Sequence, residues 1–174
     1  MQKKNLVYII GFMGSGKSTA GKKLASSLGW SFIDLDRKIE EKTGKTIAQI
    51  FSQHGESHFR SIETDLLRNV GSSAETVVST GGGTPCHGDN MDFMLQTGLT
   101  VYLKMTPFQL TGRLMKSTDE RPLLKNIPDD KLIKFIEEKL EYREKWYNRS
   151  NIIISGIDID INLLSSRIKT SLSL

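Results

Sequence analysis

Residues 6–19 read LVYIIGFMGSGKST, and this stretch decides the fold that we expect for the rest of the chain. Its second half has the spacing G-x-x-x-x-G-K-[ST], in which backbone N–H groups surround a polyphosphate and Lys17 contacts the outer phosphates. Apolar residues typical of a buried strand precede the motif, and Ala20, Leu24 and Leu28 follow it at a helical repeat. The phosphate would then lie at a helix N-terminus, so the stretch predicts a nucleoside triphosphate site. The residues assigned to it are Gly14, Ser15, Gly16, Lys17, Ser18 and Thr19.

The composition is that of a soluble globular protein: 174 residues, of which 37% are hydrophobic and 25% charged. The net charge of +4 is spread along the chain, so we expect no nucleic acid as partner and favour small anionic ligands. The one cysteine, Cys86, favours a reducing compartment. No stretch reaches the roughly 18 apolar residues of a membrane span, so we also expect no membrane partner.

Short apolar runs alternate with amphipathic segments along the chain. We expect strands at 6–10, 31–33, 76–80, 99–103 and 152–154, and helices at 17–28, 36–43, 46–70, 90–97, 107–117, 129–147 and 161–174. This alternation predicts βαβ units, and therefore one domain, 1–174, in which a parallel five-stranded sheet lies between helices on both faces. Ligands of such sheets bind at the carboxyl ends of the strands. The polar stretch 117–130, with Pro122 and Pro128, is predicted to be a mobile lid.

The sequence Asp34-Leu35-Asp36 ends the second expected strand. Two carboxylates beside a triphosphate suit two tasks, which are to hold the Mg²⁺ shell and to accept a proton from a substrate hydroxyl. The third strand ends without the acidic residue that many phosphate-loop enzymes use for their metal, so Asp34 is the nearest carboxylate for that task. The alternative for Asp36 is that it only caps the following helix.

Three glycines, Gly81-Gly82-Gly83, follow the third strand. They remove side-chain bulk where the backbone must come close to another group, and their N–H groups can bind an anion or a hydroxyl. At a strand end of this type of sheet, this favours substrate binding over the alternative of a flexible turn.

Four arginines complete the candidate site. Arg143 lies on the apolar stripe of the helix expected at 129–147, so it needs a counter-charge from a protein carboxylate or from a ligand. Arg60 has Glu63 three residues later to orient it, unless the two form only a surface ion pair. Arg113 and Arg121 flank and enter the predicted lid, where they suit closure over phosphates or remain solvated. The surplus of cations predicts a second anionic substrate, and the chemistry favours phosphorylation of a hydroxy acid.

The chain resembles the shikimate kinases over nearly its whole length. The motifs that carry the resemblance are the phosphate loop, Asp34-Leu35-Asp36 with Ile39-Glu40, Gly44 with Ile47, Ile50 and Phe51, Gly55-Glu56, Phe59-Arg60 with Glu63, Gly81-Gly82-Gly83, Arg121-Pro122-Leu123-Leu124, and Arg143 with Tyr147. The resemblance implies a cytoplasmic, usually monomeric kinase with a fold similar to that of the nucleoside monophosphate kinases. It also implies that ATP and shikimate give ADP and shikimate 3-phosphate, in the pathway to chorismate and aromatic amino acids.

The resemblance further implies roles for single residues. Asp36, Arg60, Gly82 and Arg143 would bind shikimate, with both arginines on its carboxylate and with Gly81 and Gly83 beside Gly82. Ser18 would ligate Mg²⁺, assisted by Asp34 through water. Lys17, Asp36 and Arg121 would be catalytic, with Arg121 reaching the transferred phosphate from the lid, and Arg113 would stack on the base. The substrate-binding helices would span about 34–63 and the lid about 113–130.

The sequence departs from the family pattern at Lys145, where a proline is usual two residues after the arginine at Arg143. The alternative function is that of another small phosphate-loop kinase, for example one acting on gluconate or on a nucleoside monophosphate. The block from Gly55 to Glu63 argues against both. A GTPase would need N-K-x-D and D-x-x-G motifs, which the sequence lacks.

Overall fold

Five parallel strands form the centre of the computed structural model, which describes residues 5–70, 74–117, 124 and 126–173. The strands are β1 (Leu6–Ile10), β2 (Ser31–Asp34), β3 (Thr76–Ser79), β4 (Leu99–Lys104) and β5 (Ile152–Ser155). They pair in the order β2-β3-β1-β4-β5, so β2 and β5 are the edge strands. The predicted parallel five-stranded sheet is therefore confirmed.

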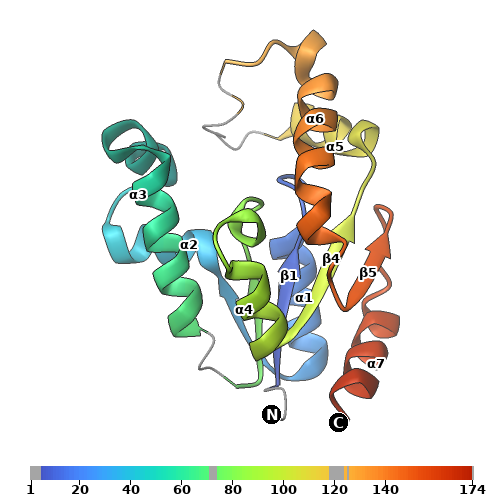
Figure 1. The fold of residues 1–174 in the computed structure, drawn as a ribbon. Helices are drawn as coiled ribbons and strands as arrows, with labels where there is room; N and C mark the ends of the chain where they lie inside the picture. Colours follow the sequence, from blue (N-terminus) through green and yellow to red (C-terminus); the bar gives the residue numbers. More distant parts are fainter. Residues whose placement is uncertain (1–4, 71–73, 118–123, 125, 174) are drawn as a thin grey trace.

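The helices cover both faces of this sheet (Figure 1). They are α1 (Lys17–Leu28), α2 (Leu35–Thr43), α3 (Ile47–Val70), α4 (Asn90–Thr97), α5 (Pro107–Lys116), α6 (Asp129–Tyr147) and α7 (Ile161–Leu172), with a short 3₁₀ turn, η1 (Thr84–Cys86). Several begin at caps visible in the sequence. Asp160 caps α7, and Thr106 and Gln109 form a reciprocal capping box at the start of α5.

The strand β1 shows how the core is divided. Its side chains alternate between the two faces, with Leu6 and Tyr8 packed in the cluster of α4 and α6, and Val7 and Ile9 in the cluster of α1 and α7. All five of its residues are buried, as expected for a central parallel strand. The fold is thus a three-layer α/β/α arrangement.

The connections that leave β1 and β3 run in opposite directions along the sheet. β1 lies between its neighbours, with Val7 paired to Val77 of β3 and to Leu99 of β4. The chain passes from β1 to the edge strand β2, whereas from β3 it passes to β4 on the other side of β1. Neighbouring strands whose connections diverge leave a crevice beyond their carboxyl ends. The phosphate loop and the three glycines both follow these two strands.

The prediction of one continuous helix over 46–70 is wrong at one residue. Gly55 has φ 81° and ψ 172°, so α3 consists of two helical segments joined at a break. Glycine adopts this backbone conformation at little cost. The rings of Phe51 and Phe59 pack across the break with centroids 4.9 Å apart, and they join Ile39 and Ile50 in a small core between α2 and α3.

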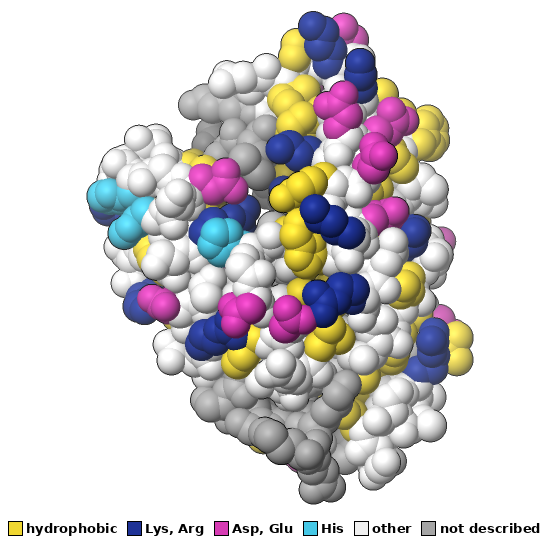
Figure 2. Space-filling model, viewed as in Figure 1, with side chains coloured by type: hydrophobic (Ala, Val, Ile, Leu, Met, Phe, Trp, Pro, Cys, Tyr) yellow, Lys and Arg dark blue, Asp and Glu magenta, His cyan; other side chains and the backbone are white. Residues whose placement is uncertain are grey.

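Seven residues of the predicted lid, 118–123 and 125, lie outside the described residues, and Arg121 and Pro122 are among them. The described part contains Leu124 and Ile127, which pack against the cluster of α4 and α6 that also holds Leu6 and Tyr8 of β1. Within the described ranges, no helix combines the length and the apolar character needed to cross a membrane. On the face shown in Figure 2, basic and acidic side chains are interspersed. Ion pairs between described side chains include those of Arg68 with Asp89 and of Arg149 with Asp92.

Candidate active site

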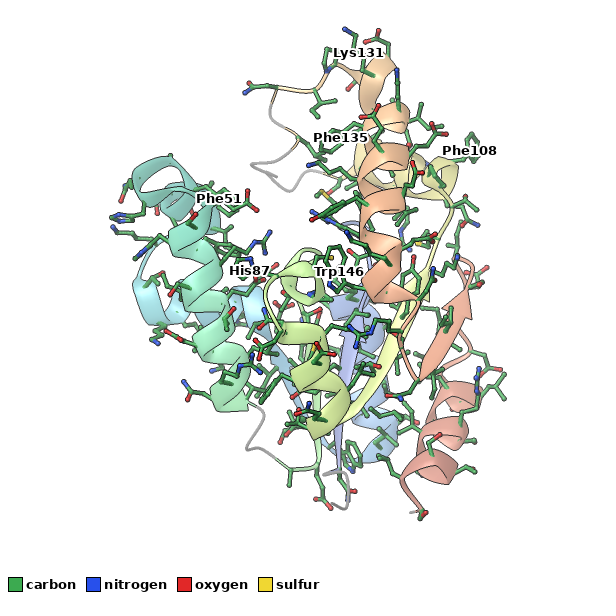
Figure 3. All side chains as sticks on the ribbon, viewed as in Figure 1. Phe51, His87, Phe108, Lys131, Phe135 and Trp146 are labelled. Atoms are coloured by element: carbon green, nitrogen blue, oxygen red, sulfur yellow. The ribbon has the colours of Figure 1, made fainter. Side chains whose placement is uncertain are left out.

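A cleft of about 840 Å³ lies beyond the carboxyl ends of the central strands. The predicted site residues that line it are Gly14, Gly16, Lys17, Ser18, Thr19, Asp34, Asp36, Arg60, Gly81, Gly82, Gly83, Arg113 and Arg143. Ser15 is buried and is not among the residues that line the cleft, and Arg121 is outside the described residues. Phe51, labelled on α3 in Figure 3, lines the side of the cleft formed by that helix.

The phosphate loop is shaped by its glycines. Gly14 and Gly16 have φ values of 79° and 84°, in the left-handed region that favours glycine. Lys17 begins α1 with its side chain folded back over the loop, and its Nζ donates to the carbonyl of Phe12 at 2.9 Å. The side chain is buried and lies where the outer phosphates of a nucleotide would be bound.

Oxygen atoms suited to a metal ion gather at the start of α1. The hydroxyl of Ser18 donates to Asp34 Oδ2 at 2.5 Å, and the hydroxyl of Ser79 is 3.3 Å from that of Ser18. Mg²⁺ is bound in proteins by one or two oxygen ligands together with waters and substrate phosphates, so this donor set fits it. Among the residues that the structure describes, no group of three or more His, Cys, Asp or Glu side chains could form a separate metal site.

The helix cap at the start of α2 is Asp34 and not Asp36. Asp34 Oδ1 accepts a hydrogen bond from the backbone N–H of Arg37 at 3.2 Å, while Oδ2 faces Ser18. The interpretation of Asp36 as only a cap is therefore wrong. Asp36 lies within the first turn of α2 and is free of that structural task.

Asp36 is a half-buried carboxyl group in the cleft. Burial raises its pKa to about 6, the charge of Glu63 adds to this, and Lys17 partly offsets it. A carboxylate with a pKa close to neutrality accepts a proton more readily than an ordinary aspartate and is still ionised at pH 7. Its position and its pKa both suit a general base.

Arg60 and Glu63 form a buried ion pair. Arg60 Nη1 donates to Glu63 Oε2 at 2.7 Å, and its Nε and Nη2 donate to Glu56 Oε1 at 3.3 and 3.1 Å. Glu63 is completely inaccessible and Arg60 is 7% exposed, so the alternative of a surface ion pair is wrong. Burial alone would lower the pKa of Arg60, but its carboxylate partners raise it above the ordinary value. The guanidinium is thus held in one orientation at the cleft wall.

Arg143 is the second buried arginine of the cleft. In the described part of the chain no carboxylate forms an ion pair with it, and its Nη1 has no hydrogen-bond partner. Its guanidinium carbon is 5.2 Å from the centre of the Phe12 ring. A buried guanidinium edge without an acceptor is costly, so a ligand anion becomes the best counter-charge.

The three glycines leave room for the two arginines. A Cβ atom on Gly82 would be 3.2 Å from Nη1 of Arg143, and one on Gly83 would overlap the guanidinium of Arg60. Neither glycine has a positive φ, so the turn needs them for space and not for backbone conformation. The predicted close approach is present, and the groups that approach are the two arginine side chains and, at Gly82, also the backbone of the phosphate loop at Met13 and Gly11.

The comparisons with known proteins show to which family the chain is similar. The model of the shikimate kinase family matches residues 13–171. The chain belongs to the shikimate kinase family. A shikimate kinase of Bacteroides fragilis is 44% identical over 147 residues, which is 84% of this chain and 82% of that protein.

Solved shikimate kinases have the same fold. The shikimate kinase of Bacteroides thetaiotaomicron is 39% identical, with a TM-score of 0.88 over 97% of this chain and 98% of the other. The Acinetobacter baumannii enzyme, solved in complex with shikimate, is 33% identical, with a TM-score of 0.86 over 99% of this chain and 95% of the other. The predicted fold class and family are thereby confirmed.

Within this member of the shikimate kinase family, Arg113 lies close to the phosphate loop. Its Nη2 would be 3.3 Å from a Cβ on Gly16, and its Nη1 lies 3.8 Å from the sulfur of Met105. The guanidinium therefore borders the part of the cleft that would hold the nucleotide.

Two contacts of this shikimate kinase site were not predicted from the sequence, although Tyr147 was named beside Arg143 among the family motifs. The hydroxyl of Tyr147 donates to the carbonyl of Gly82 at 2.5 Å, and the hydroxyl of Thr84 donates to Glu63. Tyr147 is four residues after Arg143, on the same helix face, which is a signal that the sequence does contain. Thr84 follows the glycines directly, but nothing in the sequence indicates that it meets a residue 21 positions earlier.

Proposed function

We propose that this protein transfers the γ-phosphoryl group of ATP to the 3-hydroxyl of shikimate and so produces shikimate 3-phosphate and ADP. The observation that carries the proposal is the buried Nη1 of Arg143, which has no partner among the described residues and lies in the same cleft as the phosphate loop. A carboxylate on the acceptor would supply the missing acceptor atoms, and Arg60 would hold its other side. Shikimate carries that carboxylate and the hydroxyl to be phosphorylated.

The chemistry follows from the positions of the charged groups. Asp36 takes the proton of the 3-hydroxyl as the hydroxyl oxygen bonds to the γ-phosphorus, and the bond from that phosphorus to the bridging oxygen of ATP breaks. Lys17 stabilises the negative charge that grows on the phosphates of the leaving ADP. Mg²⁺, held by Ser18 and assisted by Asp34, would neutralise phosphate charge when bound. Arg121 and Arg113 stay predictions, as a cation from the lid and as a contact to the base.

The acceptor's identity is tested by measuring ADP release, with a coupled assay, over a panel of hydroxy acids that includes shikimate and gluconate. We expect kcat/KM to be highest for shikimate by at least about tenfold, because the two arginines and the proposed base line the same cleft and suit a molecule with both a carboxylate and a hydroxyl. Higher activity with gluconate would replace the proposal by the alternative kinase function.

The contact with the carboxylate is tested on enzyme and substrate together. Arg143→Ala and a shikimate analogue with the carboxylate reduced to an alcohol should each lower kcat/KM by about 30-fold or more. If Arg143 binds the carboxylate, replacing shikimate by the analogue should lower kcat/KM much less in the variant than in the wild type, because the variant has already lost this contact. Two losses that simply add would show that Arg143 binds another part of the substrate.

A further inference from the structure

The turn η1, directly after the three glycines, is fixed between several elements. It packs against α3, α4 and α6, and its first residue, Thr84, is completely buried. The N–H of Thr84 donates to Gly81 O at 3.2 Å, and its carbonyl accepts from Asn90 Nδ2 at 3.0 Å. In Figure 3, His87 marks the end of this turn. The backbone of Thr84 is therefore a rigid support for its side chain.

The side chain of Thr84 completes the hydrogen bonding of Glu63. One carboxylate oxygen of Glu63, Oε2, accepts from Arg60, and the other, Oε1, accepts from the hydroxyl of Thr84. Glu63 is inaccessible to water, so each of its oxygens needs a donor from the protein. Two donors on opposite oxygens fix the carboxylate in one rotation, and that rotation determines where Arg60 points.

Gly81 shows that this contact lies at the acceptor site. A Cβ on Gly81 would be 2.7 Å from Glu63 Oε1, 3.0 Å from Asp36 Oδ1 and 3.0 Å from Thr84 Oγ1. The hydroxyl thus lies beside the proposed base and behind the buried ion pair. Thr84 itself is not among the residues that line the cleft.

We propose that Thr84 is a positioning residue for the acceptor: its hydroxyl fixes Glu63, and Glu63 in turn aims Arg60 at the carboxylate of the substrate. This proposal rests on the proposed function. Without the hydroxyl, Oε1 of Glu63 has no donor in the described surroundings, the carboxylate turns, and Arg60 loses its orientation. The hydroxyl of Thr84 bonds to Glu63 and Glu63 bonds to Arg60, which is the arginine proposed to bind the acceptor, so we expect nucleotide binding to stay unchanged.

The test compares Thr84→Val, which keeps the shape and removes the hydroxyl, with Thr84→Ser, which keeps the hydroxyl. We expect Thr84→Val to raise the KM and the calorimetric Kd for shikimate by about tenfold, while the KM for ATP stays within about twofold. Thr84→Ser should restore shikimate binding to within about twofold of the wild type. Thr84→Ala provides the same comparison with less crowding if Thr84→Val does not fold.

A matched control removes another threonine hydroxyl. Thr97 is partly buried, its Oγ1 lies 2.9 Å from the hydroxyl of Tyr8, and it is not among the residues that line the cleft. Thr97→Val should alter Tm without changing the KM for shikimate. If Thr84→Val binds shikimate as the wild type does, or weakens shikimate and ATP equally, Thr84 has only a structural role and the proposal is wrong.

A double variant shows whether Thr84 acts through Glu63. Glu63→Gln removes the charge that Arg60 needs, so adding Thr84→Val to it should weaken shikimate binding by less than about twofold further. A full tenfold additional loss would overturn the route through Glu63. Because the calorimetric Kd is measured without turnover, these outcomes are separate from the proposed function, which fails if the wild type forms no ADP with shikimate.

Discussion

At the scale of single residues, Lys17 carries the positive charge of the phosphate loop. Its buried ammonium group is held 2.9 Å from the carbonyl of Phe12, so it is already positioned before a nucleotide binds. We expect Lys17→Ala to lower kcat by at least about 10²-fold, the usual effect of removing one preorganised donor. Steady-state kinetics with a circular dichroism spectrum of the variant checks this, and a folded variant with kcat within threefold of the wild type would contradict it.

Asp36 should determine the fall of kcat/KM at low pH, the acid limb of the pH profile. With a pKa of about 6, Asp36 is protonated below pH 6 and cannot accept the proton of the substrate hydroxyl. We expect kcat/KM for shikimate to be level above that pH and to fall about tenfold for each unit below it. In Asp36→Asn the rate should drop by about 10²-fold and this limb should be absent. A wild-type profile that stays flat down to pH 5 would exclude Asp36 as the base.

The same residue should reduce the stability of the free protein. The pKa of Asp36 is raised from 3.8 to about 6 on folding, so the folded state binds the proton more tightly than the unfolded state. The resulting decrease in the free energy of unfolding is absent below pH 3.8, grows as the pH rises from 3.8 to about 6, and is complete above pH 6. We therefore expect Asp36→Asn to raise Tm by several degrees at pH 8, where the wild type has this charge, and by much less at pH 4.5. Calorimetry at the two pH values tests this prediction. Equal Tm shifts at both would show that the charge of Asp36 does not lower the stability of the folded protein.

The phosphate loop and the two aspartates were predicted from the sequence because each belongs to a short motif that follows a strand. The partners of Arg60 were predicted only in part. Glu63 and Glu56 lie within one helical turn of it, so their contacts are local. Thr84 reaches Glu63 only because two distant segments meet at the end of the sheet, and no local pattern contains that contact.

At the scale of elements, the turn of three glycines between β3 and η1 is a spacer for the arginines. Gly83→Ala places a Cβ into the guanidinium of Arg60, which must then move from its place in the cleft. We expect the KM for shikimate to rise by at least about tenfold, since a displaced arginine loses its charge-assisted contact. Gly112→Ala is the matched control, because nothing lies within 4 Å of its added Cβ. Equal KM values in both variants would show that the turn adapts.

The bounds of most elements were predicted to within one or two residues, because strands buried on both faces and amphipathic helices have clear patterns. The break in α3 was missed for a physical reason. Glycine is tolerated inside helices, and the apolar repeat continues on both sides of Gly55, so the pattern alone does not show the positive φ.

At the scale of the whole molecule, we predict a monomer. The phosphate loop, the two aspartates, the glycine turn and the two buried arginines meet in one cleft within a single copy of the chain. Sedimentation equilibrium should give a mass of about 19.5 kDa, with and without ligands. A dimer mass at micromolar concentration would contradict this prediction.

The order of the strands has a further consequence, for aggregation. Unpaired N–H and C=O groups on an edge strand offer a template on which another chain can extend a sheet. The edge strands here, β2 and β5, have four residues each, and the long strand β4 is enclosed between β1 and β5. A neighbouring molecule would find only a short template on either side. Growth of intermolecular sheets would first require an edge strand to detach. The native protein should therefore remain unaggregated at high protein concentration and form fibrils only after partial unfolding.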